Sequence, residues 1–157
     1  MIFKFNTAKA ISYAYTHINK NNPFYKSFQD NREGVNFISQ CVMAGCEGLN
    51  SKSCPEWYYE NEKNYSKSWV QKDEFLRYLL NQSSCGAVGR LINVNLLNAG
   101  DLIFFESKKD ESGVGLVTKN CDQNIFFVVK NVKVEEKKFD CDDYDKVNFV
   151  HVLGVKK

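Results

Sequence analysis

The chain has 157 residues and a net charge of +2, and 43% of its residues are hydrophobic while 25% are charged. A chain of this length usually forms one domain, which buries enough core to fold without a metal or a disulfide. The composition excludes disordered and low-complexity proteins, and the interspersed charges form no basic patch for nucleic acid. No apolar run approaches the ~20 residues that a membrane-spanning helix needs. We therefore expect one domain over residues 1–157, with neither nucleic acid nor a membrane as partner.

The first half of the chain has the apolar spacing of helices. In residues 7–20 the apolar side chains recur at helical intervals, and Asn21-Asn22-Pro23 supplies a stop. Residues 35–44 are apolar on several faces, which predicts a buried helix with Gly45 as its C-terminal cap. Residues 47–69 are rich in Tyr, Asn and Ser and predict a long irregular loop, a feature that often carries function. A third helix is predicted over residues 70–80.

The second half alternates short apolar runs with polar turns, the pattern of an antiparallel sheet. The predicted strands cover residues 102–105, 114–117, 125–129, 132–134 and 147–155. Because the helices come first and the strands follow, the expected fold class is α+β rather than alternating α/β. The acidic run at residues 140–145 lacks the glycine and the later glutamate of a calcium loop. We interpret it as a solvated turn, with a weak cation site as the alternative.

The cysteines and the N-terminus indicate the compartment. The six cysteines include no C-x-x-C pair of the kind that binds zinc or cycles between redox states. A four-thiolate zinc site is disfavoured by the irregular gaps between Cys41, Cys46, Cys54 and Cys85. We therefore expect the six cysteines to be mostly reduced and mostly buried, with no metal and no cofactor. Residues 1–10 lack the apolar stretch of a signal peptide, which predicts a cytoplasmic protein as given, or a secreted or wall-associated one if a leader was removed.

Several motifs resemble those of one family. The segment Glu33-Gly34-Val35-Asn36-Phe37-Ile38-Ser39-Gln40 resembles the Asp-Cys-Thr-Asn-Phe-Val-Ser-Gln signature of a bacterial putative amidase-domain family. Other segments resemble further motifs of that family in the same order: Asn22-Pro23-Phe24-Tyr25, Trp57-Tyr58-Tyr59, Ser66-Lys67-Ser68-Trp69, Ala99-Gly100-Asp101-Leu102-Ile103-Phe104 and Ser112-Gly113-Val114-Gly115-Leu116-Val117-Thr118. The resemblance covers roughly residues 8–129, and several ordered motifs are far more specific than one.

The resemblance implies a fold and a chemistry. The family is similar to the papain-like, NlpC-type cell-wall amidases and peptidases, so we expect N-terminal helices packed on a C-terminal antiparallel sheet. Those enzymes place a cysteine at the start of the central helix and a histidine on a facing strand. A free thiol, with a pKa near ~8.5, is a poor nucleophile at neutral pH, and the helix N-terminus and an imidazolium lower that pKa. The histidine then passes the proton to the leaving amine.

This sequence departs from the family at both catalytic positions. Gly34 occupies the position of the cysteine, Gly113 occupies that of the histidine, and residues 129–131 contain no histidine either. The resemblance therefore implies a catalytically inactive domain, in which two missing side chains widen a cleft for a peptide. The residues expected to contact that ligand are those that the motifs retain or that lie beside them: Glu33, Asn36, Ser39, Gln40, Trp57, Trp69 and Asn131.

Other interpretations remain open at this point. Trp57 and Trp69 could anchor the loop, which is the more common role of such rings, or line the groove. Cys41 lies two turns after Gly34 and is expected in the core, whereas a pair between another cysteine and His151 would restore hydrolysis. The sequence thus favours a binding or regulatory module for a peptidoglycan peptide or a protein partner. The alternatives are an active amidase with an unrecognised Cys/His pair and a structural protein whose cleft has no role.

Overall fold

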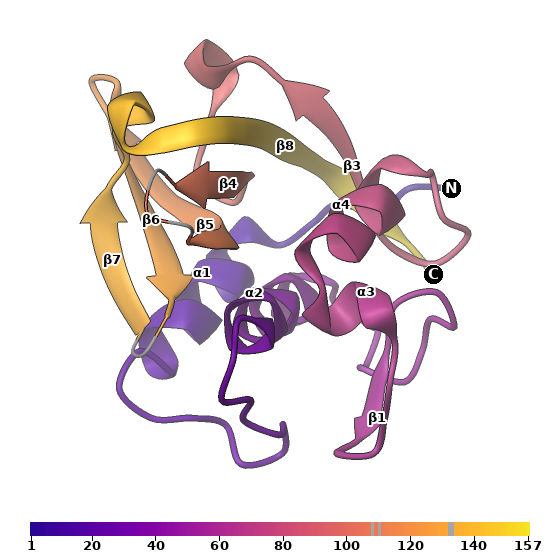
Figure 1. Ribbon diagram of the computed structural model, residues 1–157. Helices are drawn as coiled ribbons and strands as arrows, with labels where there is room; N and C mark the ends of the chain where they lie inside the picture. The colour runs from indigo at the N-terminus through magenta and orange to yellow at the C-terminus, as the bar shows by residue number, and fades with distance from the viewer. Residues whose placement is uncertain (108, 110, 132–133) are drawn as a thin grey trace.

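The computed structural model describes residues 1–107, 109, 111–131 and 134–157. It confirms the α+β class, with helices and a six-stranded antiparallel sheet in the order β3-β8-β4-β5-β6-β7 (Figure 1). The helices are α1 (Thr7–Thr16), α2 (Arg32–Gly45), α3 (Lys67–Val70) and α4 (Lys72–Leu80). The strands are β1 (Tyr59–Asn61), β2 (Asn64–Tyr65), β3 (Gly86–Ile92), β4 (Leu102–Ser107), β5 (Ser112–Cys121), β6 (Asn124–Lys130), β7 (Val134–Lys138) and β8 (Tyr144–Lys156).

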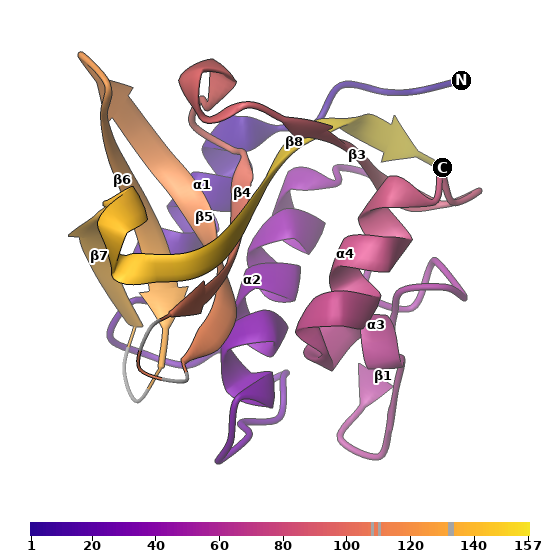
Figure 2. The same ribbon diagram turned by 45° about the horizontal axis from the view of Figure 1, so that its top comes forward.

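Helix α2 lies at the centre of the molecule, between the sheet on one side and α3 and α4 on the other (Figure 2). All of its residues are buried except Arg32 and Ala44, which are partly exposed. The apolar residues on several of its faces predicted this burial, because a helix that is hydrophobic all round must be covered all round. In the described part of the chain, no helix has the length and apolar character to cross a bilayer.

Both faces of the sheet are covered. The larger core joins the helices to one face and contains Ile38, Phe75 and Leu116. On the opposite face, Phe105 and Phe127 belong to a second cluster of apolar side chains. Adjacent strand residues point to opposite faces, so the run at residues 102–105 is apolar throughout because it contributes to both cores.

The element boundaries differ from the prediction where local signals were weak. Helix α1 ends at Thr16 instead of residue 20, and α2 begins at Arg32 instead of residue 35. The predicted helix over residues 70–80 corresponds to α4, and the extended Gln71 separates it from the short α3, which was not predicted. The long loop contains the β1–β2 hairpin, and β3 was not predicted at all since its two glycines interrupt the apolar pattern. The predicted strand at 132–134 falls partly outside the described residues, and β7 begins at Val134.

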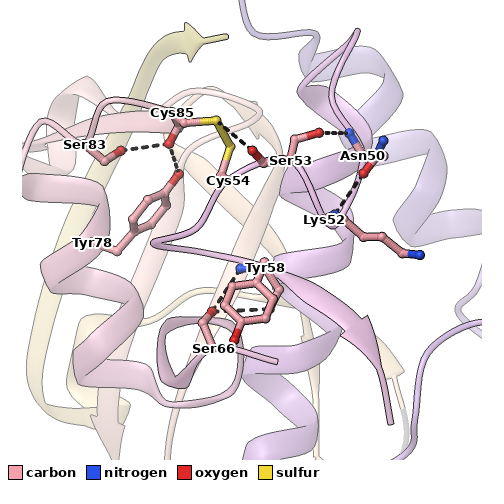
Figure 3. The surroundings of a disulfide bond; sticks show 9 residues. All are labelled: Asn50, Lys52, Ser53, Cys54, Tyr58, Ser66, Tyr78, Ser83 and Cys85. Carbon is pink, nitrogen blue, oxygen red and sulfur yellow. Dashed lines mark hydrogen bonds between the residues drawn. A yellow bond between two sulfur atoms is a disulfide. The ribbon is translucent and has the colours of Figure 1, made fainter. Parts of the chain in front are cut away.

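The expectation of mostly reduced cysteines holds for four of the six, and the other two form a disulfide that was not predicted. Cys54 and Cys85 form a disulfide whose Cα atoms lie 5.3 Å apart (Figure 3). The sequence did not reveal it because 31 residues separate the pair, and only the return of the chain through α4 brings them together. Tyr78 and Ser83 donate hydrogen bonds to the Cys85 carbonyl, so the bridge lies in a defined environment. The remaining cysteines are free: Cys41 and Cys46 are buried, and Cys121 and Cys141 are exposed.

Candidate functional site

A pocket of about 500 Å³ lies at the N-terminus of α2, where this helix meets the ends of β5 and β6. Gly34, Gly113 and Asn131, which are far apart in the sequence, all line it. Among the described residues, its lining contains no cysteine and no histidine and consists of Asn21, Ser27, Phe28, Gln29, Asp30, Asn31, Glu33, Gly34, Phe105, Glu111, Ser112, Gly113, Val114, Val129, Lys130 and Asn131. We call this pocket the Gly34 pocket.

Gly34 lies in the first turn of α2 and is buried. A Cβ atom at this position would lie 2.7 Å from the backbone carbonyl oxygen of Lys130, closer than van der Waals contact permits. The end of β6 therefore packs directly on the helix, and any side chain here would have to displace strand backbone. Glycine permits this approach because it has no Cβ.

Gly113 pairs with Phe105 on the neighbouring strand β4. A Cβ atom here would lie 3.1 Å from the Phe105 ring, while the adjacent Val114 belongs to the core that contains α2. The expected widening of a cleft by two missing side chains is thus not what the structure contains. The Lys130 carbonyl occupies the space at Gly34, the Phe105 ring lies close to that at Gly113, and the pocket lies beside them.

A buried ion pair forms one wall of the Gly34 pocket. The Glu33 and Lys130 side chains are only 8% and 10% exposed, and their charged atoms lie 3.8 Å apart. The Glu33 carboxylate accepts hydrogen bonds of 2.8 Å from the Phe28 backbone N–H and from the Asn36 amide. Lys130 Nζ donates to Asn21 Oδ1 at 2.8 Å. Such partners are what make buried charges tolerable, and they hold both groups in fixed positions.

Four of the predicted binding residues lie in the core instead of the pocket. Trp57 and Trp69 are fully buried, which supports the anchoring interpretation of both rings. The Trp69 indole N–H donates to Asn36 Oδ1 at 3.0 Å, and that of Trp57 donates to Ser39 Oγ at 3.3 Å. Asn36 and Ser39 of the signature thus hold residues 57–69 against α2 through hydrogen bonds.

Gln40 also lies outside the Gly34 pocket. It is buried, and its side-chain oxygen accepts a hydrogen bond of 2.6 Å from the Tyr13 hydroxyl. Lys130, which the sequence did not single out, takes a place in the pocket wall because β6 lies alongside α2. No local spacing signals such a position, since it depends on the packing of a strand on a distant helix.

Two of the four free cysteines, Cys41 and Cys46, lie in environments that suppress thiolate formation. Cys41 is completely buried, and this burial raises the pKa of its thiol. Burial likewise raises the pKa of Cys46 to about 12. Among the described residues, no hydrogen bond joins a cysteine sulfur to either imidazole: His17 Nδ1 contacts the Lys20 carbonyl oxygen, and His151 Nδ1 contacts Asp101.

The His151–Asp101 contact is a feature that the sequence did not reveal. His151 Nδ1 lies 2.7 Å from Asp101 Oδ1, and the carboxylate is almost completely buried. Burial raises the pKa of Asp101, and hydrogen bonds from the Asn98 backbone N–H and from His151 act in the opposite direction. Fifty residues separate the two, and only the β4–β8 pairing brings them together. Neither residue lines the Gly34 pocket.

Comparison with known proteins gives the following similarities. Residues 4–152 match the model of a family described as a putative amidase domain. The chain is 32% identical over 112 residues to the uncharacterized protein YhbB of Bacillus subtilis (strain 168). The alignment covers 69% of this chain and 34% of YhbB, so the chain spans about a third of the length of that relative. No solved structure gives a significant match.

Proposed function

The chain belongs to the putative amidase domain family, and on that premise we propose that it is a binding or regulatory module that does not hydrolyse amides. One observation carries the proposal. Gly34 and Gly113, at the positions of the family's cysteine and histidine, line the same pocket, whose described lining contains no thiol and no imidazole. Cysteine-based amide hydrolysis needs a thiolate and a proton-transferring imidazole.

The proposed architecture is papain-like, of the NlpC type, with residues 1–157 acting as one domain. Its support is the placement of α2, whose N-terminal turn lies against the sheet at the Gly34 pocket. A second support is the single sheet that both apolar cores share.

The proposed ligand of the Gly34 pocket is a peptide, either a peptidoglycan stem peptide or a segment of a protein partner. The pocket volume lies in the range of roughly 300–1,000 Å³ that ligand sites occupy. Its side-chain amides, from Asn21, Gln29, Asn31 and Asn131, offer both donors and acceptors to peptide groups. We propose neither a metal, a cofactor, nucleic acid nor a membrane as a partner.

We place the protein outside the reducing cytoplasm in this proposal. The Cys54–Cys85 disulfide supports that location, because structural disulfides persist in oxidising compartments and are rare in the cytosol. This favours the secreted or wall-associated alternative over the cytoplasmic one.

The test combines binding with cleavage. Native protein is titrated with a muropeptide mixture by isothermal calorimetry, and the recovered muropeptides are analysed by mass spectrometry. Binding without cleavage is expected. Ser112→Trp, which fills the pocket from its rim, should abolish binding, whereas Ser84→Trp at an exposed position outside the pocket should not. Cleavage by the native chain would overturn the inactivity and point to an unrecognised catalytic pair. Absence of binding would favour the purely structural alternative.

A further inference from the structure

The Gly34 pocket carries more negative than positive charge. Its charged lining residues are Asp30, Glu33, Glu111 and Lys130. The Lys130 ammonium is already engaged by the Glu33 carboxylate, 3.8 Å away. Asp30 pairs with the Arg32 guanidinium at 2.8 Å, whereas Glu111 is exposed and forms no ion pair among the described residues. A ligand that enters from solvent therefore meets carboxylates that the protein's own cations do not fully neutralise.

A second group of carboxylates lies beside the pocket, around Tyr144. The Tyr144 ring lies 5.1 Å, between centroids, from the ring of Phe105, which lines the Gly34 pocket. Burial, followed by nearby negative charges, raises the pKa of Tyr144 to about 12. Those charges are the carboxylates of Asp143, Glu111, Asp140 and Glu135, which we call the acidic patch. Glu111 belongs both to the patch and to the pocket lining, so the two negative surfaces adjoin.

The fold assembles the acidic patch from separate parts of the chain. Glu111 precedes β5, Glu135 lies in β7, and the two aspartates lie in the acidic run that connects β7 to β8 (Figure 1). None of the four forms an ion pair among the described residues. The cation closest to Tyr144 in the sequence, Lys146, is the register partner of Glu106 on β4. The acidic run is therefore part of a larger negative surface.

The charges of the acidic patch are spread out. Among the described residues, no group of three or more carboxylates, thiols or imidazoles could hold a metal ion. One small cation would thus leave most of the patch uncompensated. Several positive groups along one flexible chain can instead meet several carboxylates at once. The arrangement favours an extended ligand with several positive charges over a single ion.

We propose that the acidic patch and the Gly34 pocket together bind a basic segment of a protein partner. The inference rests on the proposed function, in which the Gly34 pocket binds a peptide, and it adds the charge of that peptide. The backbone of the segment pairs with the side-chain amides of the pocket, and its lysine or arginine side chains lie over Glu111, Asp140 and Asp143. Exposed ion pairs contribute about 0.2–1 kcal/mol each, so affinity for the segment depends on several of them.

The experiment is a calorimetric titration of the native chain at low ionic strength with two capped pentapeptides. One carries two lysines, and the other has glutamines in their place. We expect the lysine peptide to bind about tenfold more tightly, the equivalent of two exposed ion pairs. The ratio should shrink in ~0.5 M salt, because salt screens exposed charges. Spermidine, which has positive charges but no peptide groups, should bind more weakly than the lysine peptide.

A double variant tests the acidic patch directly. Asp140→Asn/Asp143→Asn removes two charges outside the pocket lining and keeps an oxygen that can accept from the Asp142 backbone N–H, as Asp140 Oδ1 does. It should bind the lysine peptide about fivefold more weakly and the glutamine peptide with unchanged affinity. Glu60→Gln/Glu62→Gln makes the same change in net charge at exposed positions outside the pocket, and it should leave both affinities unchanged.

Four results would each overturn the inference: equal affinity of the native chain for the two pentapeptides, an unchanged Kd in Asp140→Asn/Asp143→Asn, an equal loss in both double variants, or spermidine binding as tight as that of the lysine peptide. Ser112→Trp should abolish binding of the lysine peptide, and retained binding would contradict the role of the pocket. If neither pentapeptide binds, the muropeptide titration separates the two proposals. Muropeptide binding would then overturn the basic segment alone, whereas absence of all binding would overturn the proposed function as well.

Discussion

The first turn of α2 and the middle of the same helix retain the family's signature to different degrees. In the middle, Asn36 and Ser39 accept hydrogen bonds from the indole N–H groups of Trp69 and Trp57, and all four residues are buried. In the first turn, Gly34 has no side chain, and the Lys130 carbonyl oxygen lies 2.7 Å from the position that a Cβ atom would take. The comparison teaches that much of such a signature encodes packing. If Gly34 occupies the cysteine position, as we propose, this chain keeps the packing residues of the motif without its chemical group.

Truncating a tryptophan tests the packing of the middle of α2 and should have the largest effect on stability. Trp69→Ala removes a fully buried ring and leaves the Asn36 side-chain oxygen without its donor. We expect the free energy of unfolding to fall by about 3–5 kcal/mol. Urea denaturation followed by circular dichroism measures it. Leu96→Ala, at an exposed position, should change it by less than about 0.5 kcal/mol. A comparably small change in Trp69→Ala would contradict the anchoring role.

Removing the disulfide tests whether the segment that carries Trp57 depends on the Cys54–Cys85 bridge in addition to its contacts with α2. The double variant Cys54→Ala/Cys85→Ala should lose about 3 kcal/mol, because the bridge closes a loop of 31 residues and limits the unfolded chain. The same denaturation experiment measures this loss, with Cys141→Ala, an exposed free cysteine, as the control. A urea denaturation curve identical to that of the native protein, under non-reducing conditions, would show that the bridge contributes nothing to stability.

Neutralising Glu33 tests the first turn. Glu33→Gln removes the negative charge beside the buried Lys130 ammonium and replaces one of two acceptor oxygens with an amide nitrogen. We expect a loss of about 1–3 kcal/mol, the cost of leaving buried polar groups poorly paired. Glu62→Gln, at an exposed position, is the matched control and should be neutral. If both variants unfold at the same urea concentration, the ion pair is not part of a fixed pocket wall.

Adding a methyl group to each of the two glycines compares their surroundings directly. Gly34→Ala must move strand backbone and should cost about 1–3 kcal/mol, more than the helix propensity gained. Gly113→Ala meets only the edge of the Phe105 ring, which can turn, so its cost should stay below about 1 kcal/mol. Thermal denaturation of the two variants checks the order, and the reverse order would contradict the account of Gly34.

The double variant Gly34→Cys/Gly113→His extends that comparison to activity. We expect it to be less stable than the native chain and to leave muropeptides intact in mass spectrometry, because the Lys130 backbone carbonyl blocks a side chain at position 34. Cleavage by this variant would show that the site accommodates both groups, and it would attribute the proposed inactivity to two side chains alone.

The smallest expected effect concerns the Asp101–His151 pair, which lies outside the Gly34 pocket. Burial raises the pKa of Asp101 above its ordinary value of 3.8, so the folded protein holds this proton more tightly than the unfolded chain. The resulting contribution to stability is complete below pH 3.8 and is lost as the pH rises through the raised pKa. His151→Phe removes a hydrogen bond that lowers this pKa, so the pKa should rise further. Carbon-13 NMR titration of the carboxyl group measures it, and a lower pKa would contradict the assignment.

The sequence by itself determined the α+β class, the buried central helix and the family. These follow from local information: apolar periodicity, the order of helices before strands, and ordered motifs that survive as residue types. It also predicted, from the motifs around them, that Gly34 and Gly113 replace a cysteine and a histidine, and this assignment stays a prediction.

Only the tertiary structure decided what surrounds those positions. The Cys54–Cys85 bridge, the Glu33–Lys130 wall and the Asp101–His151 contact join residues that are 31, 97 and 50 positions apart. Such contacts depend on strand pairing and on how a helix packs against a sheet, so no local sequence pattern predicts them. For the same reason, the sequence assigned Asn36, Ser39 and the tryptophans to a ligand, whereas their donors and acceptors meet one another inside the core.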